Sequence, residues 1–509
     1  MKPRNVFRIL ILLALLLPQA SGDETSRDGD WLVRSEDTSG KRIHTMELTL
    51  SPQVEPKPAL KHRLLPDPFR MHEGNAALFY LKAMGFFEQD AVRDRVSEFR
   101  RQAAEAAVQP DGSRQSAAPY IWLELPLAKL PLDEAKEYLR LLRFQEGFMA
   151  EAALRKRFEL DREIRHVDSP IAYLLPEIQT MRELARTQSL RLRVAVREGR
   201  TEDAIRIIGE QLSLAQHLGQ DEFFVSNLVG MAVANIAWHD LLFIHRLPDA
   251  PNLYWALAAV PPTLTFPQEA WSLERNLLFL EIKQMGMVDA QQRLPGYWDQ
   301  LSREILEQLP TLDDGRPMFP DDPDLQRVAM AAAFAAAYPD AKRFLIEQTG
   351  MTREQVELLD EVQTVLLASR RHYEIATDET FKWANFPFWQ LMGNEAYAES
   401  EQYLDTQNGW FTLPANLLLP AVKSMQRSIP TADAGLALVR TVEAIRDDAA
   451  HNGGLPKSLD NLRLPAPIDP FTGEPLRYEH RGDHAVVSIV PWPFLEYRLV
   501  LRVLEPRDE

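Results

Sequence analysis

The pattern of apolar and polar positions predicts helices over most of the chain. Between residues 75 and 450, apolar residues recur every three or four positions with charged residues between them, which is typical of amphipathic helices. The clearest pair, 178–197 and 201–218, is separated by Gly199, a residue that suits the end of a helix. The segment 223–244 is apolar nearly all round, which predicts a helix in the centre of the protein.

Other helices are predicted between breaks rich in proline. Residues 136–158 carry Leu139, Leu142, Phe148 and Ala152 as one broad apolar stripe with basic residues between them, so they predict an amphipathic helix. Further helices are expected at 268–285, 297–309, 324–347, 352–376, 379–391, 394–404 and 433–451.

One predicted helical hairpin resembles the second half of a tetratricopeptide repeat. Gly199, Ala204, Ile208 and Leu212 fall where that motif has glycine, alanine, a bulky residue and leucine. Gln211 stands where a small residue is expected, and no second copy follows at a period of about 34 residues. We therefore predict a hairpin of this style and not a repeat array.

The two ends of the chain differ from the helical middle. Residues 23–70 are rich in proline and predict an extended segment with one strand at 43–50. Near the other end, Asp469 and Pro470 begin a turn, and three strands are expected at 476–480, 485–489 and 497–504.

The predicted fold class is therefore mainly α. A helical-hairpin body, TPR-like or α-solenoid-like, covers residues 71–430, and a small α+β cap of about three antiparallel strands covers 431–509. The cap folds because one face of its sheet can lie on the preceding helix.

The first residues predict a secretory signal peptide over 1–22. Three basic residues precede the apolar run 9–17, and the small residues Ala20 and Gly22 follow it. The run is too short to span a bilayer, which takes about 20 residues. We expect an exported protein of the periplasm or the extracellular space, and an uncleaved N-terminal anchor is the alternative.

Composition excludes several classes of function. The 509 residues are 45% hydrophobic and 26% charged, as in folded soluble proteins. The net charge of −17 gives no basic footprint for nucleic acid. The chain has no cysteine, which excludes disulfides, thiolate metal sites and cysteine nucleophiles. Common nucleotide-binding, serine-hydrolase and HExxH metalloprotease motifs are missing too.

The histidines are the nearest approach to a metal site. His480 and His484 have the spacing of a zinc pair, but a turn at 481–483 separates them and no third ligand is close in sequence. His239 and His245 are six residues apart, so on a helix they point about 120° away from each other. We expect His239 to form a hydrogen-bonded pair with Asn235, four residues earlier.

Two further groups of residues are weaker candidates. The acidic residues Asp313, Asp314, Asp321 and Asp322 suggest calcium, but they lack the regular spacing of a calcium loop and lie among prolines. Aromatic residues in 381–390 could stack on sugars if exposed, although packing between helices is their commoner use. We expect no metal and no cofactor.

Two parts of the sequence resemble known groups of proteins. The segment 453–487 contains IDPFTGEPLRY and resembles the end of the major pseudopilins of type II secretion, where a DP-x-G turn precedes a small sheet. The longer chain resembles a group of uncharacterised exported helical proteins of planctomycete-type bacteria, through the stretches PALKHRLLPDPF, GNAALFYLKA, APNLYWALAAVP, AAAYPDAKRFLIEQTGMTREQVE and FKWANFPFWQ. The second resemblance implies export and a helical fold, and it implies no activity.

The sequence favours a helical binding or scaffolding module of the cell envelope. Its expected partners are envelope proteins or glycans, without nucleic acid and without a membrane span beyond the signal segment. The alternative is an enzyme acting on envelope glycans or peptides with dispersed acidic catalytic residues. Two carboxylates about 5–10 Å apart in a deep pocket would favour the enzyme.

We expect the mature protein from its native host to begin at Ser21 or Asp23, because signal peptidase cuts after small residues. N-terminal sequencing measures this directly. A protein that begins at Met1 would contradict the signal-peptide assignment.

Overall fold

The computed structural model describes most of the chain and divides it into two compact units. The described residues are 25–35, 41–85, 90–106, 119–167, 170, 173, 175–261, 264, 268–308, 322–406, 409–492 and 495–504. The predicted signal segment, 1–22, lies outside them. The sheet unit comprises Gln19–Leu160, Leu175–Ala270 and Arg427–Glu509, and the described part of the helical unit comprises Asp161–Leu174 and Trp271–Gln426.

The predicted fold class is confirmed, because the protein is mainly helical with a small antiparallel sheet formed by its C-terminal strands. The elements of the sheet unit are β1 (Thr25–Asp28), β2 (Trp31–Ser35), β3 (Arg42–Leu50), η2 (Pro68–Arg70), β4 (His72–Asn75), α2 (Ala77–Ala83), α3 (Asp90–Ala106), α4 (Tyr120–Glu124), η3 (Leu127–Lys129), α5 (Leu132–Leu141), α6 (Phe144–Ala153), β5 (Arg155–Arg157), α7 (Pro176–Arg197), α8 (Thr201–Leu218), α9 (Phe224–Ile244), α10 (Tyr254–Ala258), η7 (Leu459–Asn461), β6 (Arg477–His480), β7 (Ala485–Trp492) and β8 (Leu495–Val503).

The helical unit contains helices alone among its described elements. They are η4 (Ile164–His166), α11 (Gln268–Glu281), η5 (Lys283–Met287), α12 (Tyr297–Gln308), α13 (Pro323–Thr349), α14 (Arg353–Glu357), α15 (Glu361–Phe381), α16 (Phe388–Leu391), α17 (Glu395–Thr406) and η6 (Trp410–Thr412). Two helices cross the division in sequence: α11 begins in the sheet unit, and α18 (Leu413–Asn452) belongs to the sheet unit from Arg427 onward.

The sheet joins the two ends of the described chain. Its strand order is β1-β2-β3-β8-β7-β6, and β3 pairs with β8 in parallel while the other neighbours are antiparallel. Along β3, Met46, Leu48 and Leu50 are buried while the residues between them are exposed, so one face of the strand lies in the core. The segment expected to hold one strand holds three, and β3 covers the predicted 43–50.

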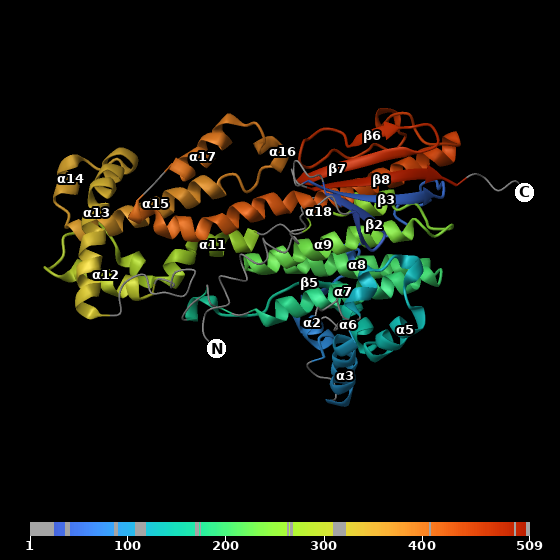
Figure 1. Cartoon of the computed structure of the whole chain (residues 1–509), viewed down its shortest axis with the longest axis horizontal. Coiled ribbons are helices and arrows are strands. Elements are labelled where there is room, and N and C mark those ends of the chain that lie inside the picture. Colours follow the sequence, from blue (N-terminus) through green and yellow to red (C-terminus); the bar gives the residue numbers. More distant parts are fainter. Residues whose placement is uncertain are drawn as a thin grey trace, which may run out of the picture. The chain divides into compact units, whose positions relative to one another are not determined.

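An aromatic cluster lies where the sheet meets α9, and Figure 1 shows the strands along one side of that helix. Tyr497 of β8 lies with its ring centre 5.1 Å from that of Trp238 on α9 and 5.3 Å from that of Trp31 on β2. All three pairs of rings in this group meet edge to face, which is a favoured geometry for aromatic packing. The cluster therefore fastens strands from both ends of the chain onto one central helix.

The predicted central helix is confirmed as α9, most of which is buried. Among the described residues it is the one helix long and apolar enough to cross a membrane, and 72% of its most apolar window lies inside the protein. Length and hydropathy alone do not separate such a core helix from a membrane span.

A buried ion pair on α18 connects three segments of the sheet unit. Glu443 and Arg446 are 1% and 0% exposed, and the guanidinium donates to the Glu443 carboxylate at 2.8 Å. Arg446 also donates to the carbonyl oxygens of Ser51 at 3.0 Å and Ala250 at 2.7 Å, and His245 lies 3.0 Å from Glu443. Burial raises the pKa of Glu443, but Arg446 and His245 outweigh it and hold that pKa below its usual value.

The hairpin of α7 and α8 agrees with the prediction, including its turn. Gly199 has φ +71°, a left-handed conformation that favours glycine, and Arg200 N–H donates to the Ala195 carbonyl at 2.9 Å to close the end of α7. The likeness of this hairpin to a tetratricopeptide repeat stays a prediction.

The helix predicted over 136–158 is interrupted. It divides into α5 and α6 at Leu142 and Arg143, and its last residues form β5, which pairs with β4. At the interruption the carbonyl of Leu142 accepts from the N–H of Gln145 at 3.0 Å and from Arg191 of α7 at 2.7 Å. A tertiary hydrogen bond therefore adds to the local backbone bond at this carbonyl.

Gly209 of α8 allows the proline-rich connector to pass close to the helix. A Cβ at Gly209 would lie well inside van der Waals distance of the carbonyl oxygen of Leu64, a backbone atom that cannot turn aside. Leu64 itself is buried, at 2% exposure. Glycine in a helix is otherwise unfavourable, so the close approach explains its presence.

We expect Gly209→Ala to destabilise the protein by about 1–3 kcal/mol, the usual cost of overpacking. Gly147→Ala in α6 is the matched control, because nothing lies within 4 Å of a Cβ placed there. The control should be neutral or stabilising by up to about 1 kcal/mol, through helix propensity. Urea unfolding at pH 7 measures both, and equal effects would contradict the close approach at Leu64.

Candidate functional site

A pocket of about 330 Å³ lies among α5, α7 and α8 in the sheet unit. Its twelve lining residues fall into three chemical groups. The six cationic residues are Lys136, Arg140, Arg143, Arg191, Arg200 and Arg206. The three acidic residues are Glu146, Glu198 and Asp203, and the three aliphatic residues are Leu139, Val194 and Ile207. The lining therefore carries a net charge of +3 in a chain whose net charge is −17.

Helical spacing explains why these residues meet. Counted from Lys136, the lining residues Leu139, Arg140 and Arg143 lie three, four and seven positions later in the chain. Lys136, Leu139 and Arg140 belong to α5 and therefore share one face of that helix. On α7, positions 191 and 194 are three residues apart, and on α8, positions 203, 206 and 207 share one face in the same way. Arg200 lies in the turn just before α8. Residues far apart in the chain converge because the α7–α8 hairpin packs against α5.

Arg191 is a buried cation of the pocket and is 7% exposed. Its terminal nitrogens donate to Gln188 at 2.6 Å, to the Leu142 carbonyl at 2.7 Å and to Gln145 at 3.2 Å. Its Nε–H has no hydrogen-bond partner within the described part of the chain, and the nearest carboxylate, that of Glu146, is 3.8 Å away. Burial lowers the pKa of this guanidinium. The pocket therefore contains a fixed cationic donor that is incompletely satisfied.

The acidic residues of the lining act as ion-pair partners. Glu198 accepts from Lys136 at 2.7 Å and from Arg200 at 2.8 Å. Hydrogen bonds from these two cations hold the pKa of Glu198 below its usual value, so the carboxylate is ionised. Asp203 pairs with Arg200 and lies 3.6 Å from Arg206. These contacts hold the long cationic side chains around the opening of the pocket.

A buried carboxylate behind the pocket links two of its arginines. Glu210 is 4% exposed and accepts from Arg206 and from the amide of Gln188. Gln188 in turn accepts from Arg191. Burial raises the pKa of Glu210, opposed by the charge of Arg206. Glu210 therefore positions Arg206 directly and Arg191 through Gln188.

Arg143 is the most available cation of the pocket. It is exposed and lies in the break just before α6, and no carboxylate of a described residue lies within ion-pair distance of its side chain. Arg140 has only a distant contact, at 3.8 Å, with Glu137 one turn away. Charge at these two positions is therefore little compensated.

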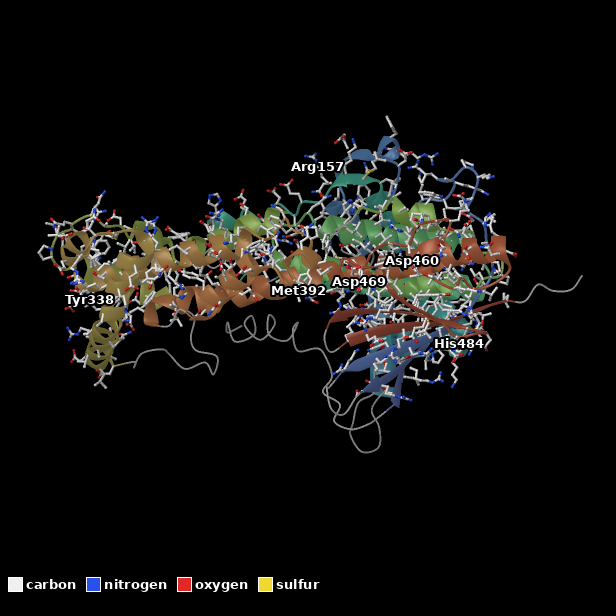
Figure 2. All side chains as sticks on the ribbon, turned by 90° about the horizontal axis from the view of Figure 1, so that it is seen from above. Arg157, Tyr338, Met392, Asp460, Asp469 and His484 are labelled. Carbon is white, nitrogen blue, oxygen red and sulfur yellow. The ribbon has the colours of Figure 1, made fainter. Side chains whose placement is uncertain are left out.

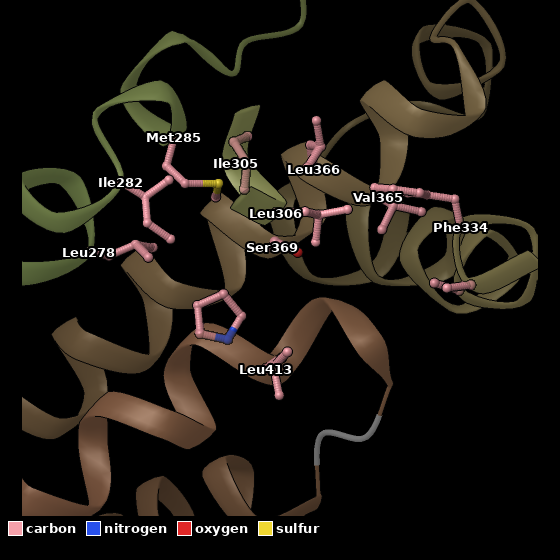
Figure 3. A pocket seen from close by; sticks show the side chains of 13 residues that line it. Leu278, Ile282, Met285, Ile305, Leu306, Phe334, Val365, Leu366, Ser369 and Leu413 are labelled. Carbon is pink, nitrogen blue, oxygen red and sulfur yellow. The ribbon is translucent and has the colours of Figure 1, made fainter. Parts of the chain in front are cut away.

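A second cavity lies in the helical unit and has a different character. It measures about 70 Å³, and among its lining residues Ser369 is the one with a polar side chain. Figure 3 shows Leu278, Ile282 and Met285 on one side of the space and Phe334 on the other. Such a lining offers no groups for catalysis or charge recognition, and we regard the cavity as imperfect packing between helices.

The structure places the two histidines proposed from spacing at the two ends of one turn. His480 ends β6 and pairs with Ala485, while His484 lies in the turn, labelled in Figure 2, 2.8 Å from Asp483. No group of three or more His, Cys, Asp or Glu side chains that could hold a metal occurs among the residues described.

The predicted pair of Asn235 and His239 is wrong. Asn235 accepts instead from the indole N–H of Trp238 at 2.9 Å. His239 lies in the aromatic cluster, 5.3 Å from the ring of Trp31 and 5.4 Å from that of Tyr497. Trp238, which lies between the two polar residues in sequence, donates to the side-chain oxygen of Asn235. The four-residue spacing of Asn235 and His239 does not reveal this partner.

The acidic segment is only partly described. Asp313, Asp314 and Asp321 lie outside the described residues. Asp322 begins α13, where its carboxylate accepts from the N–H groups of Asp324 and Leu325, each at 3.0 Å. Its role there is that of a helix N-cap.

The aromatic segment 381–390 is used mainly for packing. Phe381 meets Trp271 with ring centres 5.0 Å apart, and Trp383 meets Tyr397 at 5.6 Å. Phe386 is 51% exposed. Most of these rings are therefore engaged with other side chains, as in the packing alternative.

The turn at Asp469 forms as predicted. Its carboxylate accepts from the N–H of Phe471 at 2.8 Å, and its carbonyl accepts from Gly473 at 2.8 Å. The strands that follow, β6, β7 and β8, form one side of the six-stranded sheet.

The pocket cations were missed by motif searches, although a signal for some of them exists. Lys136, Arg140 and Arg143 recur at offsets of four and three, which places basic residues along one side of a helix. Arg191, Arg200 and Arg206 carry no such signal, because only tertiary packing brings α7 and α8 to α5.

Comparison with known proteins identifies no relatives: no family model, no curated protein and no solved structure matches this chain. The fold and the site define a mainly helical protein with a basic pocket and a small sheet.

His217 of α8 is a buried histidine with two fixed partners. Its Nδ1 lies 2.8 Å from the Tyr80 hydroxyl, and its Nε2 lies 2.9 Å from the carbonyl oxygen of Arg155. Because that carbonyl can only accept, Nε2 carries the proton and Nδ1 accepts from Tyr80. Burial lowers the pKa of His217 to about 4.

The contribution of His217 to stability should therefore be lost on acidification. Between its ordinary pKa of 6.5 and about 4, the unfolded chain takes up a proton that the folded protein does not. The stability difference between the protein and a His217→Gln variant is thus complete above pH 6.5. Below that pH it should shrink by about 1.4 kcal/mol per unit. Urea unfolding at pH 7, 6 and 5 measures it, and a difference independent of pH would contradict the neutral tautomer.

Proposed function

We propose that the protein is an exported helical binding module of the cell envelope that takes an anionic ligand in the basic pocket. The carrying observation is the convergence of six cationic side chains on a space of about 330 Å³, within a chain of net charge −17. The predicted signal segment supports the export part of the proposal.

The lining suits oxyanions more than other ligands. Five of its six cations are arginines, whose planar guanidinium groups match carboxylate and phosphate oxygens. A concave surface of one sign concentrates the electric field and raises the local concentration of ions of opposite charge.

The carboxylates of the pocket favour binding over hydrolysis. A glycan-cleaving enzyme needs one carboxyl group with a raised pKa as general acid. In this lining the pKa of Glu198 is instead lowered by Lys136 and Arg200. Glu198 therefore gives no support to the alternative of an envelope enzyme with dispersed acidic residues.

We expect citrate, a small polycarboxylate, to raise the melting temperature of the protein at constant ionic strength. Ligand at about 100 times its Kd stabilises a folded protein by about 2.7 kcal/mol. The double variant Arg140→Glu, Arg143→Glu should lose most of this shift, because both exposed cations become repulsive. Differential scanning fluorimetry with added citrate, balanced by chloride, measures the effect.

The matched control is the double variant Arg327→Glu, Arg343→Glu on α13. It makes the same change in net charge at exposed positions outside the pocket. It should keep the full citrate shift. Equal shifts in the protein and in the pocket variant would show that citrate acts elsewhere and would overturn the proposal.

A further inference from the structure

The pocket is larger than one small anion requires. A water-sized molecule needs only about 10–15 Å³ of such space, and the pocket has about 330 Å³. Its cations are also divided, since Lys136, Arg140 and Arg143 come from the α5 side and Arg200 and Arg206 from the α8 side. This arrangement suits a ligand with two or more separated negative groups.

The space between the two cationic sides is lined by aliphatic side chains. Leu139, Val194 and Ile207 line the pocket and are at most 9% exposed. Leu139 and Val194 also belong to a hydrophobic cluster beneath the pocket, so this surface is fixed by the core. No aromatic ring occurs among the lining residues described, and sugar-binding sites commonly use such rings for stacking. The lining therefore suits an aliphatic side chain more than a sugar.

Arg191 adds a selective element. Its buried guanidinium is held by three hydrogen bonds from its terminal nitrogens, and its Nε–H remains without a partner among the described residues. The Nε atom itself is covered by protein, so what Arg191 offers a carboxylate in the pocket is a fixed and partly desolvated positive charge.

We propose that the pocket binds an acidic peptide segment in which glutamate or aspartate residues flank a leucine, isoleucine or valine. The flanking carboxylates pair with the cations of the two sides, and the aliphatic side chain contacts Leu139, Val194 and Ile207. One carboxylate is attracted by the fixed positive charge of Arg191. This inference rests on the proposed function, since it names the ligand class of the same pocket.

Fluorescence anisotropy with short labelled peptides tests the inference. The probe contains two glutamates on each side of a leucine, the second peptide has serine in place of leucine, and the third has glutamine in place of every glutamate. The leucine peptide should bind about tenfold or more tightly than the serine peptide, because it buries a leucine side chain. The glutamine peptide should not bind measurably.

Variants of the pocket separate its charged and aliphatic parts. Arg143→Gln is exposed and should weaken the leucine and serine peptides by a similar factor. Ile207→Ala should weaken the leucine peptide selectively and so reduce the preference for leucine. Arg327→Gln, an exposed change outside the pocket, is the control and should leave both affinities unchanged. Unfolding of one variant leaves the peptide comparison intact, since that uses the unaltered protein.

Several outcomes would overturn the inference. Equal affinity for the leucine and serine peptides would show a site that reads charge alone. Tighter binding of an oligouronate or of inorganic phosphate than of the leucine peptide would reject a peptide ligand. Either result, obtained together with the pocket-dependent citrate shift, leaves the proposed function standing. Loss of both the peptide binding and the citrate shift rejects the two proposals together.

Discussion

The burial of opposite charges on α18 is the constraint on which the organisation of the sheet unit depends. Removing Glu443 and Arg446 from water costs several kcal/mol per ion unless each charge is paired and hydrogen-bonded. Arg446 meets that requirement with the Glu443 carboxylate and with backbone carbonyls from segments remote in sequence, including those of Ser51 and Ala250. The segment after β3 and the loop after α9 must therefore both lie against α18.

The sheet adds a second connection between the same regions. Parallel pairing of β3 with β8 brings residues more than 450 positions apart into register, from Arg42 opposite Leu495 to Leu50 opposite Val503. The aromatic cluster around Trp238 then fastens this sheet to α9. With α9 held in this way, α7 and α8 pack on it and present their outer faces to α5. The pocket among α5, α7 and α8 therefore depends on a core whose position is restricted by the charged pair and by the sheet.

The same physical rule operates in the pocket with a different result. Arg191 and Glu210 are buried charges joined through Gln188, but their hydrogen bonding is incomplete, because the Nε–H of Arg191 remains unpaired among the described residues. In the core, the charges of Glu443 and Arg446 are paired with each other and hydrogen-bonded within the chain. In the lining of the pocket, the cationic residues outnumber the acidic ones. An excess of one charge, held in place by a rigid network, is the arrangement from which a ligand gains affinity.

Local pattern determined much of this protein by itself: the boundaries of α8 and nearly those of α7, the buried α9, the turn at Asp469 and the C-terminal strands follow from apolar periodicity and turn residues. The short strands β1 and β2, the break between α5 and α6, and the hydrogen-bond partner of Asn235 were decided by tertiary structure. These features depend on partners far away in the chain, such as Arg191, which donates to the carbonyl of Leu142. The pocket belongs to the second group, because periodicity reports which face of a helix is polar and only packing decides which polar faces meet.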